Sequence, residues 1–406
     1  MSQSSFRLCV LAGACVLALN SARADVVTDW NALANDIVVA ARVGPAPGQR
    51  VLAMAQVATF EAVNAITKRY PTSGRVALEP APGASVDAAV AAAMAGTLGK
   101  LMATQQAEIN AAYRSALAAV PDGAAKSAGV ALGEQAAAAI LALRGGDGVA
   151  APDTYRPFTA PGVYVPTVSP LAIQWGQRKP WAMTAGNQFR PGPPSALTSE
   201  VWARDFNEVK ALGGKSSSQR SAGQTEIARF WEVTMPVIYY PLARGVALQP
   251  GREVTQNARL LAAAGIAMDD ALIAIFDAKY AYNFWRPITA IRNGDQDGND
   301  ATERDPTWAP FIDTPMHPEY PCAHCVLSGA LGAVLQAEIG GGPVPRLATT
   351  SSLVPGVTRS WTSIAEFTQE VANARIYDGV HYRNSTEVGT ALGRQVGELV
   401  ASKVLR

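Results

Sequence analysis

The sequence predicts an all-α fold, a multi-helix bundle, from its composition, its apolar spacing and its helix-end signals. Alanine is abundant and β-branched runs are few and short, which favours helix over strand. Apolar residues make up 49% and charged residues 17% of the 406 residues, proportions typical of globular proteins. A chain of this length can bury a sizeable core.

Helices are expected wherever apolar residues recur every three to four positions between Gly and Pro breakers. Residues 145–198 lack such a period and mix Gly, Pro, Thr and aromatics, which predicts a long irregular excursion over the surface or over the mouth of a site. The expected helices before and after it are 30–43, 50–66, 86–102, 105–119, 124–143, 199–212, 221–231 and 255–279, with a Gly-Pro break at 44–48.

The last third of the chain has the clearest helix-end signals. An apolar helix at 324–339 is ended by a run of glycines and Pro343. Ser363 begins a capping-box pattern with Glu366, which predicts a helix to about Arg375. Ser385 is expected to cap a final helix at 386–404.

Residues 1–24 have the pattern of a secretory signal peptide, in preference to a buried N-terminal helix. Arg7 precedes the apolar stretch 8–19, and Ala22-Arg23-Ala24 forms a cleavage motif. We therefore expect a secreted or periplasmic protein in which residues 25–406 form a single all-helical domain, with the catalytic motifs in 272–406. Since no other segment approaches about 18 uninterrupted apolar residues, no membrane anchoring is expected in the mature form.

The overall charge indicates no macromolecular partner. A formal net charge of +1 predicts no nucleic-acid binding, so charge chemistry has to be local. The sequence also contains no P-loop or dinucleotide glycine loop and no four-ligand zinc spacing. Small-molecule substrates are expected, and a homo-oligomer is compatible with the sequence.

The three histidines of the chain, His317, His324 and His381, all lie in its last quarter beside other polar residues. His324 begins an apolar helix, where free backbone N–H groups and the helix dipole attract an anion. The histidines occur among the cations Lys279, Arg286 and Arg375.

A pocket of three cations and two imidazoles suits a phosphate or vanadate oxyanion. Lys279 and Arg286 are seven residues apart and would share a helix face, but Pro287 disfavours helix at Arg286. Arg375 offers a planar fork for bidentate contacts. The alternative is that the cations are solvated surface charges that pair with Asp277 and Asp378.

Three spaced motifs resemble the signatures of the vanadium-dependent haloperoxidases and type-2 phosphatidic acid phosphatases. Their flanks, at 278–292, 314–324 and 373–389, and the stretch 50–66 look specifically like bacterial haloperoxidase-type proteins. The motifs are Lys279, six residues and Arg286-Pro287; Pro321-Cys322-Ala323-His324 in place of Pro-Ser-Gly-His; and Ala374-Arg375, five residues and His381.

This resemblance implies helical bundles around an oxyanion pocket. Lys279, Arg286 and Arg375 would neutralise the oxygens of vanadate or phosphate. His381 would be the covalent ligand of vanadium, or the nucleophile that forms phosphohistidine in a phosphatase. His324 would be the acid–base residue.

Two activities follow from the resemblance. A haloperoxidase would use vanadate as cofactor and hydrogen peroxide and halide as substrates, whereas an acid phosphatase would use a phosphoester and no cofactor. His317 lies where bromoperoxidases have His and chloroperoxidases have Phe, so bromide is the expected halide.

Several neutral positions of the resembled site differ. Cys322 and Ala323, expected to contact the oxyanion, replace a serine and a glycine, and a thiol is a weaker donor than a hydroxyl. Ser385 stands where phosphatases have an Asp that orients the histidine. Glu387 or Asp378 are candidates to supply that carboxylate instead.

Cys322 and Cys325 are expected to form either a local disulfide or a pair of buried thiols. A weakly active oxyanion-binding or thiol-redox protein centred on this pair is a third functional alternative. A thiol beside bound peroxide would be open to oxidation, which slightly favours a phosphatase over a peroxidase.

Overall fold

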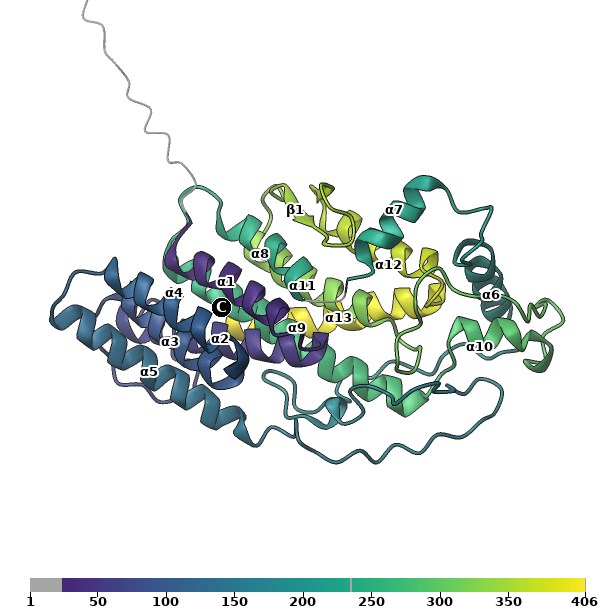
Figure 1. Ribbon diagram of the computed structural model, residues 1–406, viewed down its shortest axis with the longest axis horizontal. Helices are drawn as coiled ribbons and strands as arrows, with labels where there is room; N and C mark the ends of the chain where they lie inside the picture. Colours follow the sequence, from purple (N-terminus) through teal and green to yellow (C-terminus); the bar gives the residue numbers. More distant parts are fainter. Residues whose placement is uncertain (1–23, 234–235, 406) are drawn as a thin grey trace, which may run out of the picture.

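The computed structural model describes residues 24–233 and 236–405, and it consists almost entirely of helices (Figure 1). With 58% helix and 3% strand, the all-α prediction is confirmed. The predicted signal peptide lies, except for Ala24, outside the described residues. The helices are α1 (Val26–Ala40), α2 (Pro45–Thr67), α3 (Val86–Leu101), α4 (Gln106–Ala118), α5 (Ala124–Gly145), α6 (Glu200–Leu212), α7 (Ala222–Trp231), α8 (Tyr240–Ala247), α9 (Val254–Tyr282), α10 (Pro287–Arg292), α11 (Ala323–Ile339), α12 (Ile364–Tyr377) and α13 (Arg383–Val404).

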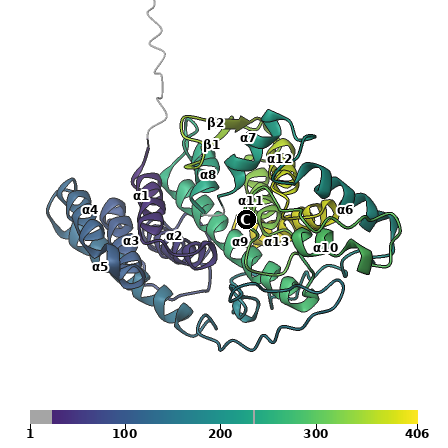
Figure 2. The same ribbon diagram turned by 45° about the vertical axis from the view of Figure 1, so that its right-hand side comes forward.

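Two groups of helices pack on either side of the long helix α9 (Figures 1 and 2). On one side, α2 contacts α9 directly, and α3 and α5 pack against α2. On the other side, α11 and α13 pack against α9 and against each other. Their close approach depends on Gly393 and Gly397, where an added Cβ would lie 2.1 Å from the carbonyl oxygen of Val326 and 2.3 Å from that of Ala330.

Most of the predicted helices are present with ends that differ by a few residues. The predicted break is present but misplaced by a few residues. It lies at 41–44, and α2 begins at Pro45, because the first turn of a helix needs no N–H from proline. Ser385 does not cap the last helix. Tyr382 occupies that position and Ser385 lies inside the first turn of α13.

Three elements were not predicted. They are the short helices α8 and α10 and a hairpin of β1 (Leu347–Thr350) and β2 (Thr358–Trp361), paired antiparallel. Each is too short to show a hydrophobic period, since the hairpin has only four residues in each strand. Its place is set by tertiary contacts, among them a hydrogen bond from Thr349 Oγ1 to the Ile238 carbonyl of 2.8 Å.

The segment 145–198 is irregular, as predicted, apart from one short 3₁₀ turn at Trp175–Gln177. It runs past the carboxy-terminal end of α9, where Tyr164 N–H donates to the Asn283 carbonyl at 2.8 Å. Farther along, Leu171 N–H donates to the Met316 carbonyl at 2.7 Å. The segment therefore lies beside the residues that flank Arg286 and His317.

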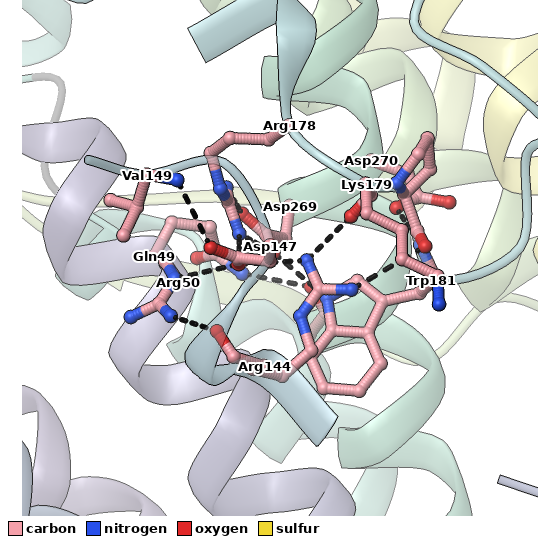
Figure 3. A network of polar contacts seen from close by, with 12 residues as sticks. Gln49, Arg50, Arg144, Asp147, Val149, Arg178, Lys179, Trp181, Asp269 and Asp270 are labelled. Carbon is pink, nitrogen blue, oxygen red and sulfur yellow. Dashed lines mark hydrogen bonds and ion pairs between the residues drawn. The ribbon is translucent and has the colours of Figure 1, made fainter. Parts of the chain in front are cut away.

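A cluster of buried charges fastens this segment to the helices (Figure 3). Arg178 donates to both oxygens of Asp269 on α9, at 2.8 and 3.2 Å, and to Asp147 at 2.7 Å. Asp147 also accepts from Arg50 of α2 at 2.9 Å, and Arg144 of α5 lies 3.0 Å away. The charges are paired within the interior, as buried charges have to be.

In the described parts of the chain, no single helix is long and apolar enough to cross a membrane. Only α3 taken together with residues 103–118 meets the length and composition test, and the two are bent by 119°.

Asp147→Asn should lower the free energy of unfolding at neutral pH and make this free energy less sensitive to acid pH. Burial alone would raise the Asp147 pKa, but hydrogen bonds from Arg50 and Arg178 outweigh burial and hold it at about 2. Because this folded pKa lies below the usual 3.8, the contribution is present above pH ~4 and is lost as pH falls through about 2. The free energy of unfolding at pH 7 should drop by about 3–5 kcal/mol.

Denaturant unfolding between pH 2 and 7 measures both effects. The exposed Asp300→Asn is the matched control and should follow the unsubstituted protein throughout. If the Asp147→Asn curve runs parallel to that of the unsubstituted protein from pH 4 to 2, Asp147 does not hold its charge in this way.

Candidate oxyanion-binding site

Three segments that are distant along the chain, 279–286, residue 324 and 375–381, bring the five predicted site residues together in the interior. Each side chain is 2% exposed or less, so the alternative of solvated surface cations is wrong. Of the two acids named in that alternative, Asp378 does pair with Arg375, in the interior, whereas Asp277 pairs with Arg190. The positions are Lys279 in the last turn of α9, Arg286 just before α10, His324 in the first turn of α11, Arg375 in the last turn of α12 and His381 just before α13.

Lys279 and Arg286 meet through a turn of the chain and not along one helix. Helix α9 ends at Tyr282, and Asn283 takes the left-handed conformation with φ 50°. Arg286 is extended, with φ −78° and ψ 155°, because Pro287 follows it and begins α10. The predicted end of the helix before Pro287 is thus confirmed.

Lys279 is fully buried, and its Nζ donates to the carbonyls of Pro318 and Glu319 at 2.8 and 2.7 Å. Burial lowers the Lys279 pKa well below its usual value, and the nearby Arg286 charge lowers it further. An anion in the pocket would stabilise the charged form of Lys279, because its negative charge counteracts both the burial and the repulsion by Arg286.

Arg286 links the two histidines at its sides. Its Nη2 lies 3.0 Å from Nδ1 of His317, and its Nη1 lies 3.3 Å from Nε2 of His381. Its Nε and Nη1 also donate to the carbonyls of His317 and Val380, at 2.9 and 2.8 Å. These contacts fix the plane of the guanidinium between the two imidazoles.

The tautomer of His381 follows from its two neighbours. A guanidinium only donates hydrogen bonds, so the Nε2 atom facing Arg286 is the acceptor of the ring. The ring proton is then on Nδ1, which donates to Glu319 Oε1 at 2.7 Å. His381 accordingly presents a lone pair on Nε2, as a ligand or nucleophile requires.

Glu319 is the site residue that the sequence did not identify. It is completely buried, and besides His381 it accepts from the Tyr382 N–H at 3.1 Å. The candidate acids Glu387 and Asp378 do not take this role, since Glu387 is exposed and Asp378 pairs with Arg375. The sequence offered one signal for Glu319, its position two residues before Pro321. This signal is weak, because a lone glutamate in a loop is ordinarily solvated.

Burial also sets the charges of this pair. It raises the Glu319 pKa to about 7, opposed by Lys279 and Arg286. It lowers the His381 pKa well below the usual value, and the cations Arg286 and Lys279 lower it further. The imidazole is therefore neutral at neutral pH. Ser385, whose hydroxyl is 3.5 Å from Nδ1, lies farther from the ring than Glu319.

Arg375 is held by Asp378 at 2.5 Å and by the carbonyl of Trp231 at 3.1 Å, both through Nη1. Burial raises the Asp378 pKa to about 7 although Arg375 opposes the shift. The Nε of Arg375 is buried and has no hydrogen-bond partner among the described residues. One edge of this guanidinium is thus paired and another is free for a ligand.

His324 is buried at the start of α11, and its Nε2 has no hydrogen-bond partner among the described residues. Burial lowers the His324 pKa well below the usual value, and the Arg375 charge lowers it further. Hydrogen bonds with the backbone of Val233 and Trp231 oppose this shift. A neutral imidazole with a free ring nitrogen can take or give a proton.

Cys322 and Cys325 are joined by a disulfide in the first turn of α11. Cys322 is the residue that caps this helix, and its Sγ accepts from the Cys325 N–H at 3.3 Å. In this state Cys322 has no S–H to donate. Of the two expected neutral contacts with an oxyanion, Cys322 and Ala323, only the backbone N–H of Ala323 is left. It lies beside the N–H of His324 at the helix start.

Together these residues fit an oxyanion such as vanadate or phosphate. The side chains of Lys279, Arg286 and Arg375 converge with only two acids among them, Glu319 and Asp378, and burial favours the neutral form of both. The orphaned Arg375 Nε needs an acceptor that an oxyanion oxygen would supply. Phosphate and vanadate present such oxygens in a tetrahedral or bipyramidal set.

Comparisons with known proteins agree with this geometry. Residues 259–406 match the family model of the second helical-bundle domain of vanadium chloroperoxidase (VCPO). The chain is 26% identical over 191 residues to vanadium chloroperoxidase from Curvularia inaequalis, covering 39% of this chain and only 31% of that protein.

Solved structures resemble the chain over nearly its whole length. The first bacterial vanadium-dependent iodoperoxidase superposes with a TM-score of 0.80 at 25% identity, covering 94% of this chain and 97% of the other. An apo-type bacterial vanadium-dependent chloroperoxidase shares the fold with a TM-score of 0.75 at 16% identity, covering 90% and 95%. By its carboxy-terminal match and its fold, the chain is similar to the vanadium-dependent haloperoxidases.

Proposed function

We propose that the protein is a vanadate-dependent haloperoxidase that oxidises halide with hydrogen peroxide. The observation that carries the proposal is the neutral His381, whose Nε2 lone pair is held toward three buried cations by Glu319 and Arg286. Bound vanadate would supply the Lewis-acid centre that activates peroxide. Haloperoxidases are also what the comparisons name, which gives the phosphatase and thiol-redox alternatives less support.

The residues have distinct roles in this proposal. Lys279, Arg286 and Arg375 neutralise the charge of the oxyanion, and His381 Nε2 is the protein ligand of vanadium. His324, with its free Nε2, moves the proton of peroxide. The enclosed, water-poor surroundings strengthen each of these interactions.

His317 is the proposed halide-selecting residue. Nδ1 of His317 lies 3.0 Å from Nη2 of Arg286 and 3.2 Å from the Pro318 carbonyl oxygen. In this proposal Nδ1 accepts from the guanidinium, which can only donate, so the proton of the neutral ring is on Nε2, a donor suited to a halide ion. Burial lowers the His317 pKa well below its usual value, and Lys279 lowers it further, so the ring is neutral. Bromide is the proposed substrate.

We also propose that the protein is exported and that its mature chain forms one domain. Residues 1–24 would direct export to the periplasm or the exterior and then be removed. Residues 25–406 would function as one domain acting on small molecules.

Halide oxidation by the purified protein should require added vanadate. We expect bromide oxidation by hydrogen peroxide only after vanadate is supplied, and orthophosphate should compete because it binds the same cations. His381→Ala should abolish the activity, whereas the exposed Glu387→Gln should retain it. Phosphoester hydrolysis without vanadate-dependent halide oxidation would replace the proposal with the phosphatase alternative.

Glu319→Gln should weaken oxyanion binding without unfolding the protein. The amide can donate as well as accept, so it no longer fixes the proton on Nδ1 of His381. Loss of such an orienting partner typically costs about 10–100-fold in affinity. Calorimetric titration with vanadate and with orthophosphate measures the effect, and Glu387→Gln is the matched control. Equal affinity in the two variants would contradict the role of Glu319.

His317→Phe should lower the preference for bromide more than it lowers vanadate affinity, because Arg286 loses the Nδ1 contact but keeps the carbonyls of residue 317 and Val380. The substitution removes the Nε2 donor but keeps an aromatic ring against Phe276, whose centroid lies 5.3 Å away. Losing one hydrogen bond to an ion corresponds to about tenfold in kcat/KM for bromide. Steady-state rates with bromide, iodide and chloride test this, and unchanged ratios would remove His317 from halide selection.

A further inference from the structure

The disulfide between Cys322 and Cys325 lies where the expected chemistry would deliver an oxidant. Both residues are in the first turn of α11, on either side of the His324 position. They are the only cysteines within residues 24–233 and 236–405, since Cys9 and Cys15 precede that range. Their oxidation state is therefore linked to the chemistry at His324.

Packing isolates this pair from large reagents. Both cysteines are 0% exposed. Helix α13 presses against them through Gly389, where an added Cβ would be 2.7 Å from the Cys322 carbonyl oxygen and 3.2 Å from the Cys325 Cβ. The N–H of Cys322 is also tied to the Ser385 carbonyl at 3.2 Å. Because both sulfurs are this deeply buried, a protein thiol has no access to them, so the proposed oxidant has to be as small as hydrogen peroxide.

A single thiol at this position would be damaged by peroxide. Oxidation leads from the thiol to sulfenic acid and on to sulfinic and sulfonic acids, which thiols do not reverse. A neighbouring thiol diverts the first product into a disulfide. The Cα atoms of the two cysteines are 5.4 Å apart, within the ordinary distance for a disulfide.

We propose that Cys322 and Cys325 are a peroxide-reactive pair, in which Cys325 resolves the oxidation of Cys322. The Cys322 sulfur attacks peroxide, the O–O bond breaks, and Cys322 sulfenic acid and one water form. The Cys325 sulfur then attacks the Cys322 sulfur, the S–O bond breaks, and hydroxide leaves with the thiol proton as a second water. Two thiols have lost two electrons and peroxide has gained them.

The disulfide is the form that persists while peroxide is used. It removes the weak S–H donor of Cys322 from the oxyanion site but leaves the helix-start N–H groups in place. The biological need for the pair rests on the proposed function, in which peroxide is a substrate, although its reactivity can be measured without vanadate or halide. The presence of a thiol then no longer favours a phosphatase over a peroxidase.

Mass spectrometry of the full chain and of its peptides tests the pair. The protein is reduced, freed of reductant and given hydrogen peroxide without vanadate. The unsubstituted protein should lose two hydrogens and re-form the disulfide. Cys325→Ser should instead accumulate two or three oxygens on Cys322. Cys322→Ser is the matched control and should leave Cys325 mostly reduced, because Cys325 is the resolving thiol.

Quenching the peroxide-treated unsubstituted protein in denaturant that contains dimedone gives a second measurement, because unfolding exposes the buried sulfurs to this larger reagent. It does not depend on the folding of a variant. The label should appear on Cys322 and not on Cys325. The proposal fails if Cys322 of Cys325→Ser stays reduced, or if the reduced pair does not re-form its disulfide at the same peroxide dose. A reactive pair in a protein without halide oxidation would overturn the proposed function alone, and halide oxidation beside an inert pair would overturn only this inference.

Discussion

The fold depends on the pairing of charges in the interior around helix α9. In the middle of this helix, Asp269 and Asp270 are both completely buried. Arg178 holds Asp269 (Figure 3), and three backbone N–H groups of residues 181–183 hold Asp270. Without these partners each charge would cost several kcal/mol. The long segment 145–198 therefore has one stable position, which is against α9.

The same helix carries a second buried cluster of charged residues, in which the positive and negative charges are not matched. In the cluster of Figure 3, three guanidiniums face three carboxylates, so the charges are matched within the protein. At the end of α9 three cations face Glu319 and Asp378, and burial raises the pKa of both acids to about 7. The first cluster has its charges matched without a ligand, although the Nε atoms of Arg144 and Arg178 have no hydrogen-bond partner among the described residues. The second is left with excess positive charge, which an oxyanion relieves.

The imidazole of His381 is oriented by a carboxylate from a distant part of the chain. A carboxylate one helical turn after the histidine is absent, and Ser385 takes its place. Glu319 supplies the carboxylate from the loop before α11, 62 residues earlier in the chain. The Glu319 backbone carbonyl also accepts from Lys279, so the loop that orients His381 is fixed by a cation of the same pocket.

The sequence by itself determined the helical class, most helix positions and the cations and imidazoles of the site. Those features are local, because helical spacing, caps, breakers and short motifs can each be recognised from a few neighbouring residues. It did not reveal Glu319, the hairpin, α8 or α10, and it misplaced the cap of α13. These depend on contacts between distant segments, so only the tertiary structure decided them. A glutamate in a loop becomes part of a site when folding buries its carboxylate against His381, because a buried carboxylate must find a partner.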